Sequence, residues 1–189
     1  IYMFIICEGP DNVGKSTLIQ NLKNYYNNYT LHTLHYSNVK SQDPITYSKK
    51  LYFEMFNMMV DITKFNNTGI ICDRSHIGEM VYGPIYRNYS GEHVLTIEKK
   101  FKRFKDVWDN LILVTLIDKP ERLIEREDGL SFSTDINMKR PEISNFIEAT
   151  TKSNIKHKLV INIEHNDELQ ALSIVTDYID ELRMKNAKS

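Results

Sequence analysis

Residues 9–17 constrain the fold of this chain more than any other segment. They read Gly-Pro-Asp-Asn-Val-Gly-Lys-Ser-Thr, which fits the pattern G-x-x-x-x-G-K-S/T without a mismatch, and the apolar run 3–7 leads almost directly into them. Glycines let the backbone turn so that several N–H groups point at one anion, and a helix that starts at such a loop adds the positive end of its dipole. The segment therefore predicts a strand, a phosphate-binding loop and a helix, in that order.

Each position of this loop has an expected part in binding a nucleoside triphosphate. Lys15 brings a cation to the β- and γ-phosphates and is a candidate catalytic residue, and the hydroxyl of Ser16 can ligate Mg²⁺. The backbone N–H groups of the loop surround the phosphates. We therefore expect Mg²⁺ as the cofactor, and ATP as the ligand of Asn12, Val13, Gly14, Lys15, Ser16 and Thr17.

Apolar runs of strand length alternate with amphipathic segments along the chain. The apolar runs are residues 3–7, 69–72, 111–117 and 158–163, with a weaker one at 31–36. The amphipathic segments are residues 15–26, 44–65, 96–108, 120–127, 141–151 and 167–184. Continuous apolar strands are typical of parallel sheets buried on both faces, with helices covering those faces. The sequence thus predicts an α/β fold of three layers, with a single domain spanning residues 1–189.

The charge balance excludes some classes of function. The chain has 24 Lys and Arg against 25 Asp and Glu, a formal net charge of −1, which argues against a protein that coats nucleic acid or an anionic membrane. No apolar run reaches the length of a membrane span, and two cysteines are too few for a disulfide scaffold. Residues 1–7 lack the basic lead-in and the length of a secretory signal. We therefore expect a cytoplasmic protein, of a cell or of an infected host, that partners neither polymeric nucleic acid nor a membrane.

A polar pair closes the apolar run at 69–72, and both of its members are candidate catalytic residues. Asp73 follows the run directly, and a carboxylate at a strand end beside a phosphate loop supports Mg²⁺; its alternative role is to cap the next helix. Arg74 can hold a second phosphate through two parallel hydrogen bonds, and its alternative role is a surface salt bridge. Cys7 and Cys72 each precede the acid that closes their strand, and we expect both to be small core residues.

Together these motifs resemble the thymidylate kinase family, within the P-loop nucleoside monophosphate kinases. The likeness is carried by residues 8–17, which read E-G-P-D-x-x-G-K-S-T, and by Asp73 and Arg74 about sixty residues later. The resemblance implies a five-stranded parallel sheet in the nucleoside monophosphate kinase order, a lid, and usually a homodimer. It also implies that Asp11 binds the 3′-hydroxyl of the deoxyribose and that Arg74 holds the acceptor monophosphate.

The resemblance also suggests residues for the acceptor pocket. Residues 77–87 are similar to a region of viral and phage deoxynucleotide kinases in which the tyrosine at the Tyr82 position lies against the sugar or base, although Tyr82 could equally be a packing aromatic. The segment 44–65 loosely matches the family helix whose phenylalanine stacks on the base, which favours Phe53; the alternative is an aromatic stripe that packs in the core. The family's arginine that reads the thymine carbonyl has no counterpart at 57–59, and Lys40 is the candidate for a second missing arginine.

Two arginines precede an irregular segment that we expect to form a lid, residues 127–139. One branch of the family has a catalytic arginine inside the phosphate loop, where this chain has Asn12, so the resemblance implies an arginine from the lid region instead. Arg126, eight residues after Asp118, matches that lid arginine, and Arg122 lies one helical turn earlier. Both are candidate ATP ligands, and Arg126 is a candidate catalytic residue. The alternative is a solvated helix in which neighbouring glutamates pair with them.

These features predict phosphoryl transfer from ATP to the 5′-phosphate of a deoxynucleoside monophosphate, with dTMP or a related pyrimidine as the acceptor. One alternative is a deoxynucleoside kinase of the thymidine type, which phosphorylates a 5′-hydroxyl and needs a base, for which Glu8 is the nearest candidate. A nucleotide-dependent switch is the non-enzymatic alternative, but the N-K-x-D motif of guanine-specific switches does not occur. The sequence therefore favours an enzyme and leaves the acceptor open.

Overall fold

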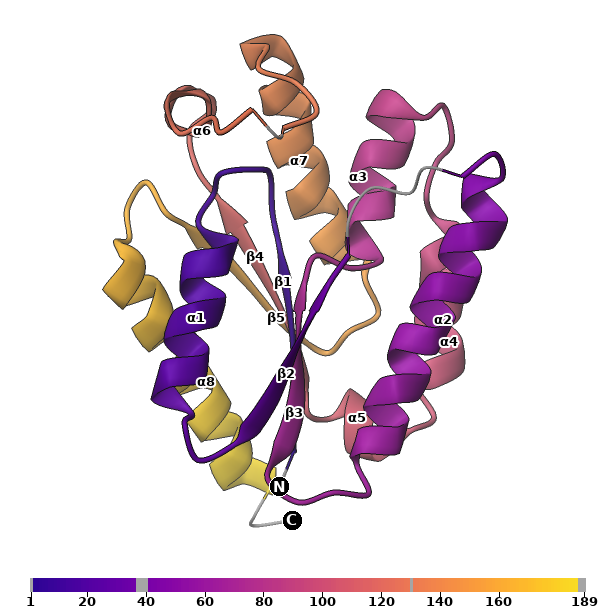
Figure 1. Cartoon of the computed structure of the whole chain (residues 1–189), viewed down its shortest axis with the longest axis vertical. Helices are drawn as coiled ribbons and strands as arrows, with labels where there is room; N and C mark the ends of the chain where they lie inside the picture. The colour runs from indigo at the N-terminus through magenta and orange to yellow at the C-terminus, as the bar shows by residue number, and fades with distance from the viewer. Residues whose placement is uncertain (1, 37–40, 130, 187–189) are drawn as a thin grey trace.

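One all-parallel sheet organises the computed structural model, which describes residues 2–36, 41–129 and 131–186. Within these residues the spatial order of the strands is β2-β3-β1-β4-β5 (Figure 1). The strands are β1 (Tyr2–Glu8), β2 (Thr30–His35), β3 (Thr68–Asp73), β4 (Leu111–Ile117) and β5 (His157–Asn162). This is the nucleoside monophosphate kinase order, so the predicted five-stranded parallel sheet is confirmed.

The central strand, β1, is buried on both faces of the sheet. It pairs with β3 and β4, so that Ile5 lies opposite both Ile71 and Ile112. Successive side chains of a strand point to opposite faces, and accordingly Phe4 and Ile6 enter one hydrophobic core while Ile5 enters the other. Because all five strands are parallel, their carboxyl ends lie at one edge of the sheet, which is where sites form in such folds.

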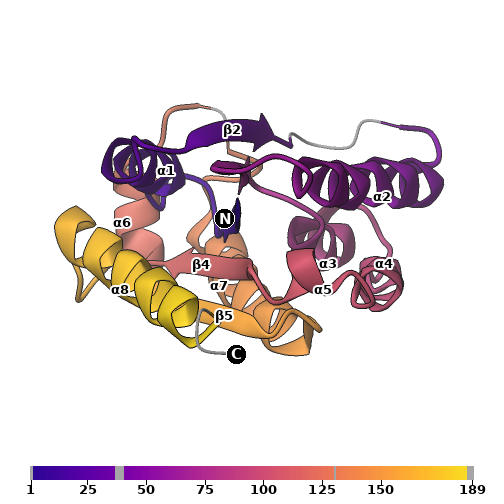
Figure 2. The ribbon, with the colours of Figure 1, turned by 90° about the horizontal axis from the view of Figure 1, so that it is seen from below.

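Helices cover both faces of this sheet, as Figure 2 shows from below. The described helices are α1 (Lys15–Tyr25), α2 (Pro44–Ile62), α3 (Ile77–Tyr86), α4 (His93–Phe101), α5 (Lys105–Trp108), α6 (Pro120–Glu125), α7 (Ile136–Lys152) and α8 (Glu168–Asn186). α1 and α8 pack on one face, and α2, α3, α4, α5 and α7 pack on the other, which confirms the three-layer architecture. Among the described helices, none has an apolar stretch long enough to cross a bilayer.

α3 lies where the sequence pattern predicts no helix. Gly83 and Pro84 are residues that usually end helices, and both stand in its last turn. Packing outweighs these preferences: most of α3 is buried and it contacts α7. A side chain at position 83 would come within 2.8 Å of the carbonyl oxygen of Tyr89, so this close approach requires glycine.

Two further boundaries differ from the predicted ones. The helix expected at 141–151 begins earlier, at Ile136, because the carboxylate of Asp135 accepts a hydrogen bond from the N–H of Asn137 (2.8 Å) and caps α7. The lid segment (residues 127–139) therefore includes the first turn of α7. The helix expected at 96–108 is divided into α4 and α5, which are separated by a turn at 102–104.

Candidate functional site

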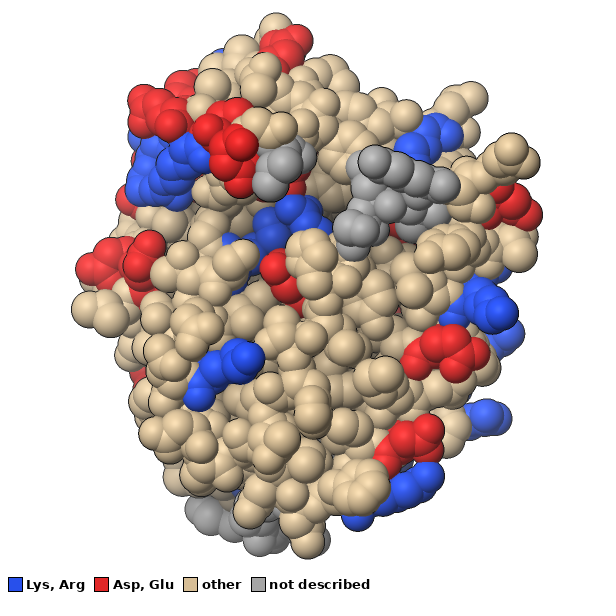
Figure 3. Space-filling view, viewed as in Figure 1, with Lys and Arg blue, Asp and Glu red and all other residues tan. Residues whose placement is uncertain are grey.

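A cleft of about 1460 Å³ lies at the carboxyl edge of the sheet. One end is walled by α6 and the start of α8, and the other by α2 and α3. Figure 3 shows basic side chains in a recess near the middle of this face, with acidic atoms beside them. The structure brings twelve of the predicted site residues into the cleft lining: Asp11, Asn12, Val13, Gly14, Lys15, Ser16, Thr17, Asp73, Arg74, Tyr82, Arg122 and Arg126.

The phosphate loop folds tightly between β1 and α1. Gly9 has a φ of 139°, and a side chain there would come within 2.3 Å of the carbonyl oxygen of Leu116, so only glycine fits. Lys15 is buried and its Nζ donates hydrogen bonds to the carbonyl oxygens of Gly9 (3.0 Å) and Pro10 (2.6 Å). Burial, and then the charge of Arg74, lower the pKa of Lys15 to about 8. The ammonium group therefore stands inside the loop rather than in solvent.

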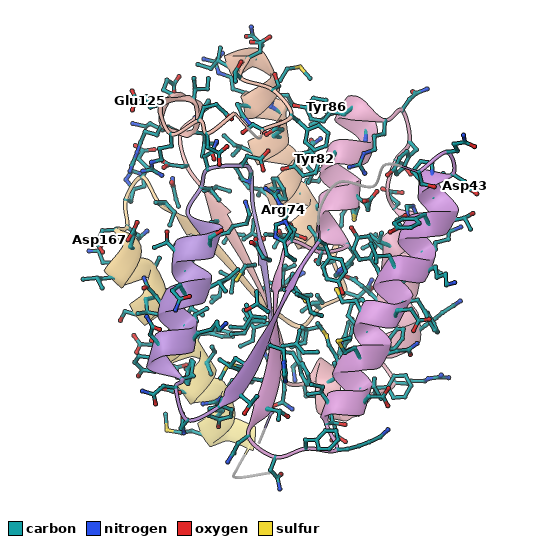
Figure 4. The ribbon with its side chains drawn as sticks, in the orientation of Figure 1. Asp43, Arg74, Tyr82, Tyr86, Glu125 and Asp167 are labelled. Carbon is teal, nitrogen blue, oxygen red and sulfur yellow. The ribbon has the colours of Figure 1, made fainter. Side chains whose placement is uncertain are left out.

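Asp11 and Arg74 form an ion pair across the cleft. Arg74 Nη2 donates a hydrogen bond to Asp11 Oδ1, and Nη1 lies 3.4 Å from the hydroxyl of Tyr82 (Figure 4). Arg74 has a left-handed backbone with a φ of 69°, and its N–H donates to the carbonyl oxygen of Cys7 (3.0 Å). Burial would lower the pKa of Arg74, but Tyr82 and Asp11 raise it above its usual value. The guanidinium is thus a fixed cation beside the phosphate loop.

The residues around Asp73 fit a magnesium ion that arrives with a nucleotide. Its Oδ1 is buried and has no hydrogen-bond partner among the described residues, while Oδ2 lies 3.1 Å from Nδ1 of His35. Ser16 is exposed and lines the same cleft. Within the described parts of the chain, no three His, Cys, Asp or Glu side chains gather as a metal cluster. Mg²⁺ in nucleotide sites usually takes one or two carboxylates plus phosphate oxygens and water, and Asp73 with Ser16 meets that requirement.

Glu8 ends β1 and lines the floor of the cleft. Its Oε1 accepts hydrogen bonds from Ser75 Oγ (2.8 Å) and from the N–H of Gly78 (3.3 Å). Its Oε2 is buried and has no partner among the described residues. Burial raises the pKa of Glu8, and the hydrogen bond from Ser75 and the nearby positive charges oppose that rise.

The two candidate arginines of α6 share one acid. Oδ2 of the buried Asp118 lies 3.1 Å from Arg126 Nη1 and 3.4 Å from Arg122 Nε. Asp118, rather than a neighbouring glutamate, is therefore the ion-pair partner that the structure records for both. Both arginines are more than one-third exposed and line the cleft, so their guanidinium groups can reach a bound phosphate.

The lid segment contacts both the phosphate loop and α3. Asn12 Nδ2 donates to Glu127 Oε2 and to Ser131 Oγ, each at 3.1 Å. Phe132 stacks on the rings of Tyr82 and Tyr86, with centroids 4.9 and 4.8 Å apart. Sequence reasoning missed Phe132 as a cleft residue because its contacts lie far away along the chain.

No family model and no curated protein matches this sequence. Solved structures do match over nearly the whole chain. YorR from Bacillus subtilis, in complex with phosphorylated GDP, has a TM-score of 0.65 at 19% identity, and the match covers 98% of each chain. Thymidylate kinase from Candida albicans has a TM-score of 0.63 at 14% identity, with 96% of this chain and 92% of that chain covered. Deoxyadenosine kinase from M. mycoides with bound dATP has a TM-score of 0.53 at 16% identity, with 94% and 100% covered.

The chain has the P-loop kinase fold. In this P-loop kinase fold, α2 and α3 form the end of the cleft remote from α6, and their side chains differ from the expected ones. Phe53 points to the outer surface, where its ring packs against Phe101 of α4 at 5.1 Å, and it does not line the cleft. The preceding residue, Tyr52, lines it instead. Successive residues of a helix differ by about 100° in direction, which separates these two neighbours.

A buried polar cluster lies next to Tyr52. Glu79 accepts hydrogen bonds from the hydroxyl of Tyr52 (3.3 Å), from Nη1 of Arg87 (3.0 and 3.1 Å) and from the hydroxyl of Tyr89. Glu79, Arg87 and Tyr52 line the cleft, and sequence reasoning singled out none of these three. The positions of the two acids and bases, eight residues apart on α3, were the available signal. The predicted role of Lys40 concerns a residue outside the described ranges.

Proposed function

We propose that this chain transfers the γ-phosphoryl group of ATP to the 5′-phosphate of a deoxynucleoside monophosphate, with dTMP or a related pyrimidine as the acceptor. The observation that carries the proposal is the pair of Arg74 and Asp11 in the same cleft as Lys15. Two cations in one cleft suit two phosphates, and a carboxylate beside Arg74 suits a sugar hydroxyl. A thymidylate kinase among the solved structures of this fold supports it.

Catalysis would come from alignment and charge neutralisation, without a covalent intermediate. Lys15 and the N–H groups of the loop hold the β- and γ-phosphates, and Arg126 and Arg122 approach them from α6. Arg74 exchanges Asp11 for the acceptor phosphate, which frees Asp11 for the sugar hydroxyl. The acceptor phosphate is already ionised, so this reaction requires no general base. Closure of the lid segment excludes water from the transferred group.

Ser16 and Asp73 would hold Mg²⁺. When bound, the ion neutralises phosphate charge and orients the phosphates for in-line transfer. The unpartnered Oδ1 of Asp73 supports this role, because a buried carboxylate oxygen without a partner is otherwise costly. Oδ2 remains paired with His35 or exchanges that contact for a water ligand.

The test is ADP release with ATP and Mg²⁺ across a panel of monophosphates, nucleosides and no acceptor. Lys15→Ala should lower monophosphate turnover by about 100-fold or more, because it removes a cation that stabilises the transferring group. The matched control is Lys102→Ala, which removes an exposed lysine at the end of α4. Arg74→Ala should mainly raise the acceptor KM. Normal turnover in Lys15→Ala would contradict the proposal.

The free oxygen of Glu8 favours a second candidate, a kinase that acts only on deoxynucleosides. Activity with nucleosides alone would establish it, whereas ATP binding without turnover on any acceptor would indicate a switch. The viral or phage type and the homodimer that the resemblance implies belong to the same proposal. Sedimentation at equilibrium tests the dimer directly, and a monomer would remove that part.

A further inference from the structure

A chain of buried hydrogen bonds leads from the cleft floor into the core beside α4. Ser75 Oγ donates to Glu8 Oε1 (2.8 Å) and lies 3.1 Å from Nδ1 of His76. Nε2 of His76 lies 2.8 Å from Oε1 of Glu98. All four side chains are at most 2% exposed. The mechanism proposed above uses none of the last three.

The surroundings of Glu98 require it to be a carboxylate. Its Oε1 accepts from Ser153 Oγ (2.6 Å), and its Oε2 accepts from the backbone N (2.6 Å) and Nδ2 (2.9 Å) of Asn154. Ser153 itself accepts from the N–H of Ile155 (3.2 Å), which leaves its hydroxyl proton for Glu98. Burial would raise the pKa of Glu98, but these donors and His76 hold it below its ordinary value. An ionised carboxylate only accepts, so Nε2 of His76 is a donor.

The number of available protons then determines the charge of His76. Ser75 has one hydroxyl proton, which it gives to Glu8, so its contact with Nδ1 of His76 is one in which Ser75 accepts. His76 thus carries a proton on both ring nitrogens. It is an imidazolium ion between two carboxylates, Glu98 on one side and, through Ser75, Glu8 on the other. A positive charge at this position favours the ionised form of Glu8.

We propose that Ser75, His76 and Glu98 hold Glu8 as an oriented carboxylate that accepts the proton of a hydroxyl-bearing acceptor. The cleft then phosphorylates the 5′-hydroxyl of a deoxynucleoside as well as a monophosphate. Ser75 and Gly78 N–H hold Oε1, whereas Oε2 has no partner among the described residues. Gly78 also has no side chain to crowd Oε2, since an added Cβ would lie 3.9 Å away. The free oxygen belongs to a residue of the cleft wall.

Glu8 lies near both cations that position the reactants, because the charges of Lys15 and Arg74 both act on its carboxylate. In the proposed step, Oε2 takes the proton of the 5′-hydroxyl as O5′ bonds to the γ-phosphorus. The bond from that phosphorus to the β,γ-bridging oxygen breaks, and ADP leaves with its electron pair. The proton passes from Glu8 to solvent when the products depart. The inference rests on the proposed function for its donor, ATP.

The first experiment measures the protonation of His76 by nitrogen-15 NMR at about pH 7. The chain has six histidines, and His76→Gln identifies the signals that belong to this ring. We expect imidazolium shifts for both nitrogens of His76 in the wild-type protein. Glu98→Gln should leave only one nitrogen protonated, because it removes the negative partner. A neutral His76 in the wild-type protein would overturn the inference, whatever the variants do.

The second experiment compares turnover on a deoxynucleoside and on its monophosphate. Glu8→Gln should lower nucleoside turnover by about 100-fold or more, which is the usual contribution of a general base, and monophosphate turnover by less than about tenfold. His76→Gln should lower the kcat for the nucleoside by about tenfold and leave the KM for ATP unchanged, since His76 is a positioning residue. His93→Gln is the matched control, because His93 also contacts a buried serine (Ser48, 2.7 Å) but does not line the cleft.

The outcomes separate this inference from the proposed function. Monophosphate turnover without nucleoside turnover overturns the inference and supports the proposed function. Nucleoside turnover alone, lost in Glu8→Gln, supports the role of Glu8 and overturns the proposed function. Equal losses on both acceptors in His76→Gln, with normal circular dichroism, would make the chain of hydrogen bonds purely structural and overturn the inference.

Discussion

At the residue scale, the two central cations of the cleft each have an intramolecular partner. Lys15 donates to two carbonyl oxygens of its own loop, and Arg74 is paired with Asp11. A phosphate must compete with these partners, so binding exchanges one set of hydrogen bonds for another and gains only the difference. Affinity at this site therefore depends on the charge that each group carries when the phosphate arrives.

The affinity for ATP should fall as pH rises through about 8. Burial is the main cause that brings the pKa of Lys15 to about 8, so the ammonium is mostly protonated at neutral pH and mostly neutral above that value. We expect the Kd to rise by up to about tenfold per pH unit on the alkaline side. Calorimetry from about pH 6.5 to 9.5 measures it. Lys15→Arg should flatten the curve, because a guanidinium stays charged in this range; a flat curve in the wild-type protein would contradict the argument.

At the element scale, the lid segment is attached at two places. Asn12 of the phosphate loop bonds to Glu127 and Ser131, and Phe132 stacks on two tyrosines of α3. The segment therefore bridges the ATP end and the acceptor end of the cleft. Any opening of the segment must break these contacts, which makes them adjustable parts of the turnover cycle.

Replacing Phe132 should loosen the lid segment. Each aromatic pair contributes roughly 0.5–1.5 kcal/mol beyond the area it buries, so Phe132→Ala removes about 1–3 kcal/mol of attachment. We expect faster amide hydrogen exchange across residues 127–135 and a higher KM for the acceptor. Phe65→Ala is the control, because Phe65 is 62% exposed in the turn after α2. Unchanged exchange in Phe132→Ala would show that the stack does not hold the segment.

Local patterns predicted the sheet and the phosphate loop, because a continuous apolar run and a motif of nine residues each lie within one segment. Side-chain direction on a broadly apolar helix was not predictable in the same way. Tyr52, Met55 and Phe56 are all buried, so the apolar face of α2 does not reveal that Phe53 packs outward on α4. α3 was missed since its glycines and proline are tolerated only through tertiary packing.

The buried network behind Glu8 could not be found from spacing alone. Glu8 and Ser75 are 67 residues apart, and His76 and Glu98 are 22 residues apart on different elements. No periodicity links such positions, and they meet only because β1 and β3 are neighbours in the sheet and α4 packs beside α3. Sequence analysis identified Glu8 as a candidate base but could not supply the groups that orient it.

At the scale of the whole molecule, the cleft joins the parts that the sheet keeps separate. Two cores lie on opposite faces of the sheet, and the residues of the cleft come from elements of both. A ligand that contacts α1, α6, α2 and α3 together ties both layers to the same edge. Binding should consequently raise the stability of the entire fold and not only that of one loop.

Magnesium with a non-hydrolysable ATP analogue should raise the Tm. At about 100 times the Kd, binding to the native state adds about 2.7 kcal/mol, which corresponds to roughly 5–10 °C for a chain of this size. Scanning calorimetry measures the shift, which EDTA should reduce and Lys15→Ala should nearly abolish. An equal shift in Lys15→Ala would mean that the analogue binds somewhere other than the phosphate loop.

The left-handed backbone at Arg74 has a consequence for laboratory evolution. A φ of 69° costs a side-chain-bearing residue about 1–2 kcal/mol that glycine does not incur. A library screened for heat resistance alone would therefore tend to enrich glycine at this codon and discard the guanidinium that grips the acceptor. Breeding a hardier variant of this protein requires a selection in which turnover and endurance are scored in the same round.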